Sequence, residues 1–129
     1  MSFNWLEKVE SELNCWGVFY GDFFYLLSSA IVERKISFAG FLSDASRGFG
    51  FYVREGLFYL LDQDWDEPSK FNEVSFFIGD VESSSISVSE FVRAVEVAAL
   101  TYVKEFNDEK DMALDCLSRL ELRYSAFLN

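Results

Sequence analysis

The chain contains no histidine among its 129 residues. Histidine is the commonest general base in enzymes and a common metal ligand, so its absence excludes Ser–His–Asp triads and most zinc and copper sites. The two cysteines, Cys15 and Cys116, lie far apart in the sequence, and two cysteines alone cannot supply a zinc cluster. The sequence therefore predicts neither a histidine-based active site nor a cysteine metal centre, and we expect no cofactor.

Export signals, membrane spans and linkers are also missing. The N-terminus has no basic region followed by an apolar stretch, which a secretory signal requires. The most apolar window, Phe23–Val32, is only ten residues long, whereas a membrane helix needs about 20 residues. Two isolated cysteines make no disulfide framework. We therefore expect a cytoplasmic protein with reduced thiols, no membrane contact and a single domain over residues 1–129.

Basic residues are few: 11 lysines and arginines face 22 acids, which gives a net charge of −11. A nucleic-acid reader needs clustered basic residues, and Arg34-Lys35 is the only adjacent pair. Gly48-Phe49-Gly50 is a lone G-x-G that does not follow a predicted strand, so it is no phosphate-binding loop. The sequence predicts no direct binding of nucleic acid.

Apolar and aromatic residues, by contrast, are plentiful. Half of the residues are hydrophobic, 19% are aromatic and 15 are phenylalanine, which is far more than a disordered acidic tail contains. Helical spacing of apolar residues predicts helices over 3–13, 22–34 and 37–47, one from the capping box Ser87/Glu90 to Phe106, and one over 110–124. Residues 18–25 can alternatively begin as a strand instead of a helix.

Alternation with a period of two appears in the middle of the chain. It predicts strands over 49–54, 57–61 and 74–79, to which 85–88 can add a short fourth. The acidic stretch 62–70, which holds the only proline, is predicted to be a loop. Helices, then a small antiparallel sheet of three to four strands, then helices indicate an α+β fold in which the sheet packs against several helices.

Residues 62–82 carry more than half of the net charge, with seven acids and one base. A dense acidic patch attracts basic proteins or metal ions and steers a basic partner quickly. Trp65, between Asp64 and Asp66, resembles an interface hot spot; the alternative is that Trp65 packs back on the domain. The charged residues of the segment are Asp62, Asp64, Asp66, Glu67, Lys70, Glu73, Asp80 and Glu82.

Calcium binding is an alternative use of these acids. Asp62-x-Asp64-x-Asp66 begins like an EF-hand loop, and Glu73 occupies the twelfth position, where a bidentate carboxylate belongs. The sixth position is Glu67, however, where the turn requires glycine, and a strand rather than a helix is predicted to precede the loop. A solvated acidic loop with coincidental spacing explains the pattern more simply.

Catalysis by a pair of carboxylates needs two acids in different environments across a cleft. The acids here are crowded into one loop beside a tryptophan. We therefore expect a binding protein and not an enzyme.

Three blocks of the sequence resemble a known family. They are 41–51 (FLSDASRGFGF), 71–77 (FNEVSFF), and Ser87-Val88-Ser89-Glu90-Phe91 followed by Ala98, Ala99 and Tyr102. Over roughly residues 18–106, their order and spacing resemble the ribonuclease-toxin immunity proteins of bacterial contact-dependent growth inhibition systems.

The resemblance implies a small cytoplasmic protein that binds the toxic domain of a cognate effector and neutralises it in a 1:1 complex. Such toxins are commonly basic nucleases, so an acidic inhibitor can cover the surface that holds RNA phosphates. The matching residues are scaffold positions and carry over no contact residue. From charge alone, the predicted toxin-binding residues are Asp62, Asp64, Trp65, Asp66, Glu67, Asp80 and Glu82.

Overall fold

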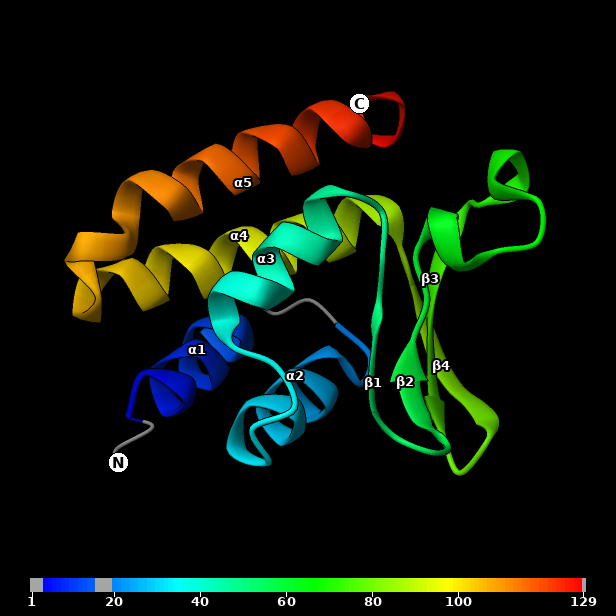
Figure 1. Ribbon diagram of the computed structural model, residues 1–129, viewed down its shortest axis with the longest axis horizontal. Helices are drawn as coiled ribbons and strands as arrows, with labels where there is room; N and C mark the ends of the chain where they lie inside the picture. The colour runs from blue at the N-terminus through cyan, green and yellow to red at the C-terminus, as the bar shows by residue number, and fades with distance from the viewer. Residues whose placement is uncertain (1–3, 16–19, 129) are drawn as a thin grey trace.

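A four-stranded antiparallel sheet stands beside a layer of helices in the computed structural model, which describes residues 4–15 and 20–128 (Figure 1). The helices of this described part are α1 (Asn4–Cys15), α2 (Phe23–Val32), α3 (Phe38–Ser46), α4 (Val88–Glu105) and α5 (Lys110–Arg123). The strands are β1 (Phe51–Arg54), β2 (Leu57–Tyr59), β3 (Glu73–Ile78) and β4 (Val81–Ser87), in the spatial order β1-β2-β3-β4. The predicted α+β fold is confirmed.

The capping box starts α4 as predicted. Ser87 Oγ accepts a hydrogen bond from the Glu90 amide at 3.0 Å, and the Glu90 carboxylate accepts one from the Ser87 amide at 2.9 Å. These two bonds satisfy amides that a helix start otherwise leaves unpaired. Across residues 4–15 and 20–128, no helix combines the length and apolarity needed to cross a membrane.

One face of the sheet packs against the helices. Val53, Tyr59 and Phe76 point to this side and are at most 2% exposed. The Tyr59 ring lies 5.6 Å from that of Phe91 in α4, measured between centroids. Phe91 in turn meets Phe23 of α2 at 5.9 Å, edge to face. Strand and helix side chains therefore share one continuous core.

The other face of the sheet carries a ladder of aromatic rings. Tyr52, Phe58 and Phe77 stack across β1, β2 and β3 with ring centroids 4.6 and 4.7 Å apart. They alternate along the strands with the buried residues Phe51, Tyr59 and Phe76, as the period of two requires. Since the helices lie on the opposite side (Figure 1), this aromatic ladder faces outward.

The element boundaries differ from the prediction in the sheet region. β4 starts at Val81, earlier than the predicted 85–88, because its polar run Glu82 to Ser85 lies on an edge strand and shows no apolar alternation. The predicted loop contains two 3₁₀ turns, Asp62–Asp64 and Pro68–Lys70. Of the alternative strand at 18–25, residues 18 and 19 lie outside the described part, and Phe23 onward belongs to α2.

Candidate functional site

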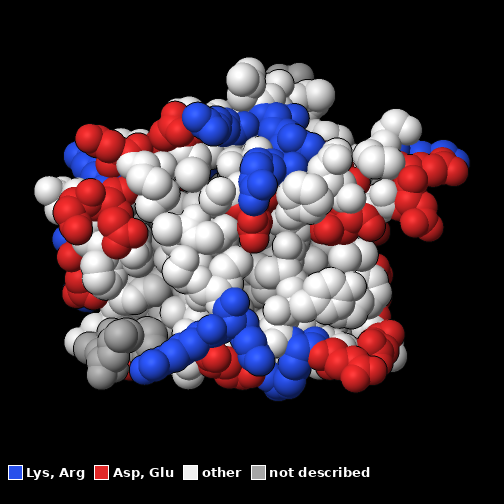
Figure 2. All heavy atoms as spheres, viewed as in Figure 1, with Lys and Arg blue, Asp and Glu red and all other residues white. Residues whose placement is uncertain are grey.

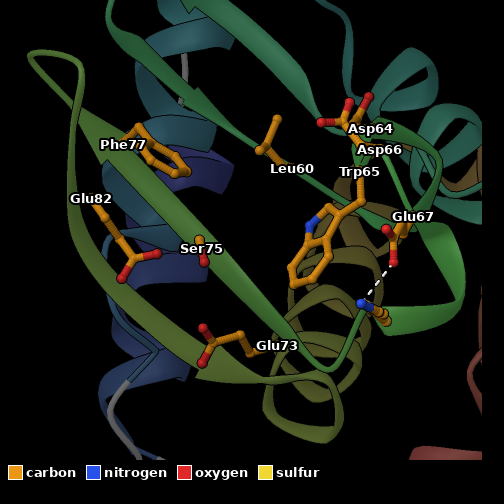
Figure 3. A pocket seen from close by; sticks show the side chains of 10 residues that line it. Leu60, Asp64, Trp65, Asp66, Glu67, Glu73, Ser75, Phe77 and Glu82 are labelled. Atoms are coloured by element: carbon orange, nitrogen blue, oxygen red, sulfur yellow. Dashed lines mark ion pairs between the residues drawn. The ribbon is translucent and has the colours of Figure 1, made fainter.

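Acidic side chains gather over the loop between β2 and β3. Figure 2 shows acidic side chains on the projection at the right, at the lower end of the sheet and along the left edge over the helices, whereas basic side chains on this face lie mostly along the top and bottom of the molecule. Against this loop, the outer face of the sheet forms an open groove of about 560 Å³. Its lining residues are Leu60, Asp64, Trp65, Asp66, Glu67, Lys70, Glu73, Ser75, Phe77 and Glu82 (Figure 3).

Asp64 fastens the loop to the sheet. Its Oδ2 accepts hydrogen bonds from the backbone amides of Gly50 at 2.7 Å and Leu61 at 2.9 Å. The backbone is tightly packed here: a Cβ added to Gly50, just before β1, would clash with the carbonyl oxygen of Tyr59 at the end of β2. The Asp64 carboxylate, which was predicted to contact a partner, is therefore already hydrogen-bonded within the fold and stabilises one wall of the groove.

Asp62 turns away from the groove toward the C-terminal helix. Its carboxylate accepts hydrogen bonds from Arg123 Nη2 at 2.6 Å and from the Tyr124 hydroxyl at 2.7 Å, and its side chain is only 15% exposed. Burial raises the pKa of Asp62. The hydrogen bonds from Arg123, Tyr124 and Gln63 and the charge of Arg123 outweigh this effect, so the pKa lies below its usual value. Asp62 is a structural ion-pair partner and does not line the groove.

Trp65 packs back on the domain, as one of the two interpretations of its role expected, whereas its part as an interface hot spot stays a prediction. Its ring is half-buried and meets Phe71 edge to face at 5.5 Å. The same ring lines the groove, across from Phe77 (Figure 3). Trp65 thus packs back on the core and also forms an aromatic wall of the groove.

Three groove carboxylates have no partner among the residues that the structure describes. Glu67 pairs with Lys70, the one basic residue of the lining, at 2.9 Å (dashed line in Figure 3). Among the described residues, Asp66, Glu73 and Glu82 form no side-chain hydrogen bond or ion pair. The groove therefore keeps uncompensated negative charge beside two aromatic rings.

Ser75 lies at the floor of the groove. It is 6% exposed, and within the described part of the chain its hydroxyl has no hydrogen-bond partner. Within residues 4–15 and 20–128, the fully enclosed hydroxyls without a partner are those of Tyr20 and Tyr59; Ser75 Oγ is not one of them and so stays open to the groove. Ser75 Oγ is thus a polar atom that an occupant of the groove can satisfy.

Asp80 lies at the other end of the sheet. It occupies the β3–β4 turn with φ 64°, and its amide donates to the Gly56 carbonyl at 3.2 Å in the β1–β2 turn. Asp80, which charge alone placed among the toxin-binding residues, therefore lies apart from the groove. Of the seven residues predicted from charge, five line the groove, and Asp62 and Asp80 do not.

Five residues that line the groove were not among the contact residues predicted from charge: Leu60, Lys70, Glu73, Ser75 and Phe77. A signal for the three in β3 was present, since Val74 and Phe76 point into the core and their neighbours in the strand must point outward. Pairing then sets Phe77 opposite Glu82 of β4. The pairing depends on a register shift between Phe76 and Phe77 that no sequence pattern indicates.

The carboxylates of the calcium-like spacing do not converge. Asp62 faces Arg123, whereas Asp64 faces the backbone of Gly50 and Leu61. Over residues 4–15 and 20–128, no group of three or more histidine, cysteine or acidic side chains is arranged to hold a metal ion. The geometry gives the calcium alternative no support.

Comparisons with protein-family models, curated proteins and solved structures find no match to this chain. The resemblance to immunity proteins therefore stays a prediction that rests on the three sequence blocks. The groove is the feature from which a function can be argued.

Proposed function

We propose that this protein is an immunity-type inhibitor that binds a basic toxin domain, a nuclease, in a 1:1 complex in the cytoplasm and covers its substrate-binding surface. The observation that carries the proposal is the groove. In it, Asp66, Glu73 and Glu82 have no partner among the described residues and lie beside the rings of Trp65 and Phe77.

These features match the anatomy of a protein interface. Aromatic side chains at the centre supply most of the binding energy, and charged groups around them steer the partner and set its orientation. The aromatic ladder formed by Tyr52, Phe58 and Phe77 extends the apolar surface from the groove across the sheet.

The mode of inhibition follows from charge. A nuclease holds the phosphates of its substrate with lysine and arginine side chains. An acidic groove that binds those side chains competes directly with the nucleic acid. Occlusion of this kind needs no catalytic group and no cofactor in the inhibitor.

The test uses the reading frame directly upstream, which we expect to encode a protein that ends in a short basic domain. That domain should bind this protein tightly and lose its nuclease activity in the complex, with association slowing as salt rises. Reversing two groove charges, Glu73→Lys with Glu82→Lys, should weaken binding by about 100-fold or more.

The matched control is Glu10→Lys with Glu121→Lys, two exposed acids on α1 and α5 that lie outside the groove. This control changes the net charge equally and should leave affinity within about threefold, since distant exposed charges are screened. Failure of the basic domain to bind, or equal losses in both double variants, would overturn the proposal.

A further inference from the structure

We propose that the groove is an arginine slot: it takes the guanidinium of an arginine side chain from the partner in preference to the ammonium of a lysine. The inference rests on the proposed function for the source of that arginine. The selectivity itself is carried by four residues of the groove, which are Trp65, Phe77, Ser75 and Glu82.

The walls of the groove favour a flat, weakly hydrated cation. Trp65 on the loop and Phe77 on β3 face the groove from two sides, with Leu60 between them (Figure 3). A guanidinium stacks on aromatic faces and gives up water readily, whereas an ammonium is compact and strongly hydrated. Aromatic and aliphatic walls therefore discriminate between the two side chains.

The charge of the groove is arranged along one face of the sheet. Glu73, Ser75 and Phe77 alternate on β3 and so point the same way, and Glu82 of β4 pairs with Phe77. The Lys70 ammonium does not neutralise this side, because it pairs with Glu67 on the loop. A cation that enters the groove thus meets Glu73 and Glu82 without an internal competitor among the described residues.

The Ser75 hydroxyl points to a ligand that carries several hydrogen-bond donors. Ser75 as a residue is 6% exposed, and its hydroxyl opens onto the groove floor without a partner in the described chain. A guanidinium has five N–H donors in a rigid plane, so it can serve this oxygen and a carboxylate at once. The Glu82 carboxylate is the acceptor on the neighbouring strand.

The experiment uses two acetylated and amidated peptides that are identical except for a single arginine or lysine between glycines and serines. NMR titration of the full chain at low salt measures affinities into the millimolar range. We expect the arginine peptide to bind about tenfold more tightly, with shifts confined to the groove. Ser75→Ala should remove most of this preference, and Glu82→Gln should weaken both peptides.

The control variant is Asp80→Asn, which removes one acid from the same hairpin but outside the groove and should change neither affinity. Equal affinity for the two peptides, no detectable binding of the arginine peptide, or retention of the preference in Ser75→Ala would each overturn the arginine slot. These outcomes are independent of toxin binding. If a basic domain binds and its arginines and lysines are interchangeable, the proposed function stands and the arginine slot fails. If the arginine peptide is preferred but no basic domain binds, the arginine slot stands and the proposed function fails.

Discussion

The guanidinium of Arg123 and the carboxylate of Asp62 form a two-contact ion pair, with N–O distances of 2.6 and 3.3 Å, between residues 61 positions apart in the chain. It ties the end of α5 to the start of the acidic loop. Asp64 ties the same loop to Gly50 near β1. The loop that carries Trp65 is therefore held at two points, so the groove is formed before a partner arrives.

Asp62→Asn should destabilise the fold, because Arg123 loses its charged partner in a site that is largely shielded from water. We expect a loss of about 1–3 kcal/mol in the free energy of unfolding, measured by denaturant titration. Asp115→Asn is the matched control, since Asp115 and Arg119 form an exposed pair on α5 whose loss should change stability by less than about 0.5 kcal/mol. Equal effects of the two substitutions would contradict the structural role of Asp62.

The same pair predicts a pH dependence. The folded pKa of Asp62 lies below its ordinary value of 3.8, so the unfolded chain takes up the proton more readily than the folded one. The stabilisation from Asp62 is thus complete above pH 3.8 and is lost as the pH falls through the folded pKa. The stability gap between the native chain and Asp62→Asn should be constant near neutral pH and shrink below pH 3.8. A gap that persists in strong acid would be the contrary result.

Asp64→Ala should loosen the loop, because it leaves the amides of Gly50 and Leu61 without their acceptor. Each such amide loses a charge-assisted bond, and we expect a combined loss of about 1–3 kcal/mol. Hydrogen exchange at these two amides should accelerate. Asp66→Ala removes a neighbouring acid with no such bonds and should stay within about 0.5 kcal/mol; an equal loss there would argue that charge alone matters.

Gly50→Ala should prevent stable folding, because the new Cβ would clash with the backbone oxygen of Tyr59 in β2. We expect a loss above about 4 kcal/mol or an insoluble product. Gly79→Ala is the comparison. Its Cβ meets nothing within 4 Å and suffers only from φ +67°, which costs about 1–2 kcal/mol. Thermal melts of both variants measure the difference, and a mild effect at Gly50 would show that the backbone of Tyr59 in β2 can move away.

Ser87→Ala should weaken the start of α4, because the Glu90 amide loses its acceptor at 3.0 Å. The expected loss is about 1 kcal/mol in the free energy of unfolding. Ser89→Ala, two residues later and without a side-chain hydrogen bond in the described structure, should be neutral or slightly stabilising. If both serines behave alike in denaturant titration, the cap contributes nothing.

The fold was predictable where its causes are local. The helical spacing of Phe91, Val95 and Ala98 and the box Ser87/Glu90 need only neighbours within one or two turns, and α4 begins where the sequence predicts. β4 was predicted too short, since its edge position removes the apolar alternation that marks a strand. The groove was half predicted: the acidic loop was evident, but the floor at Ser75 and the wall at Phe77 come from strand pairing.

The sequence by itself determined that the chain is acidic, that it lacks histidine chemistry, and that its helices and strands occur in an α+β order, because these follow from composition and from periods of a few residues. Only the tertiary structure decided which acids have no internal partner. Asp62 and Asp66 look equivalent in sequence, yet Asp62 is bound by Arg123 and Tyr124, whereas Asp66 lines the groove. The difference depends on packing α5 against the loop, and contacts across about half the chain leave no local pattern in the sequence.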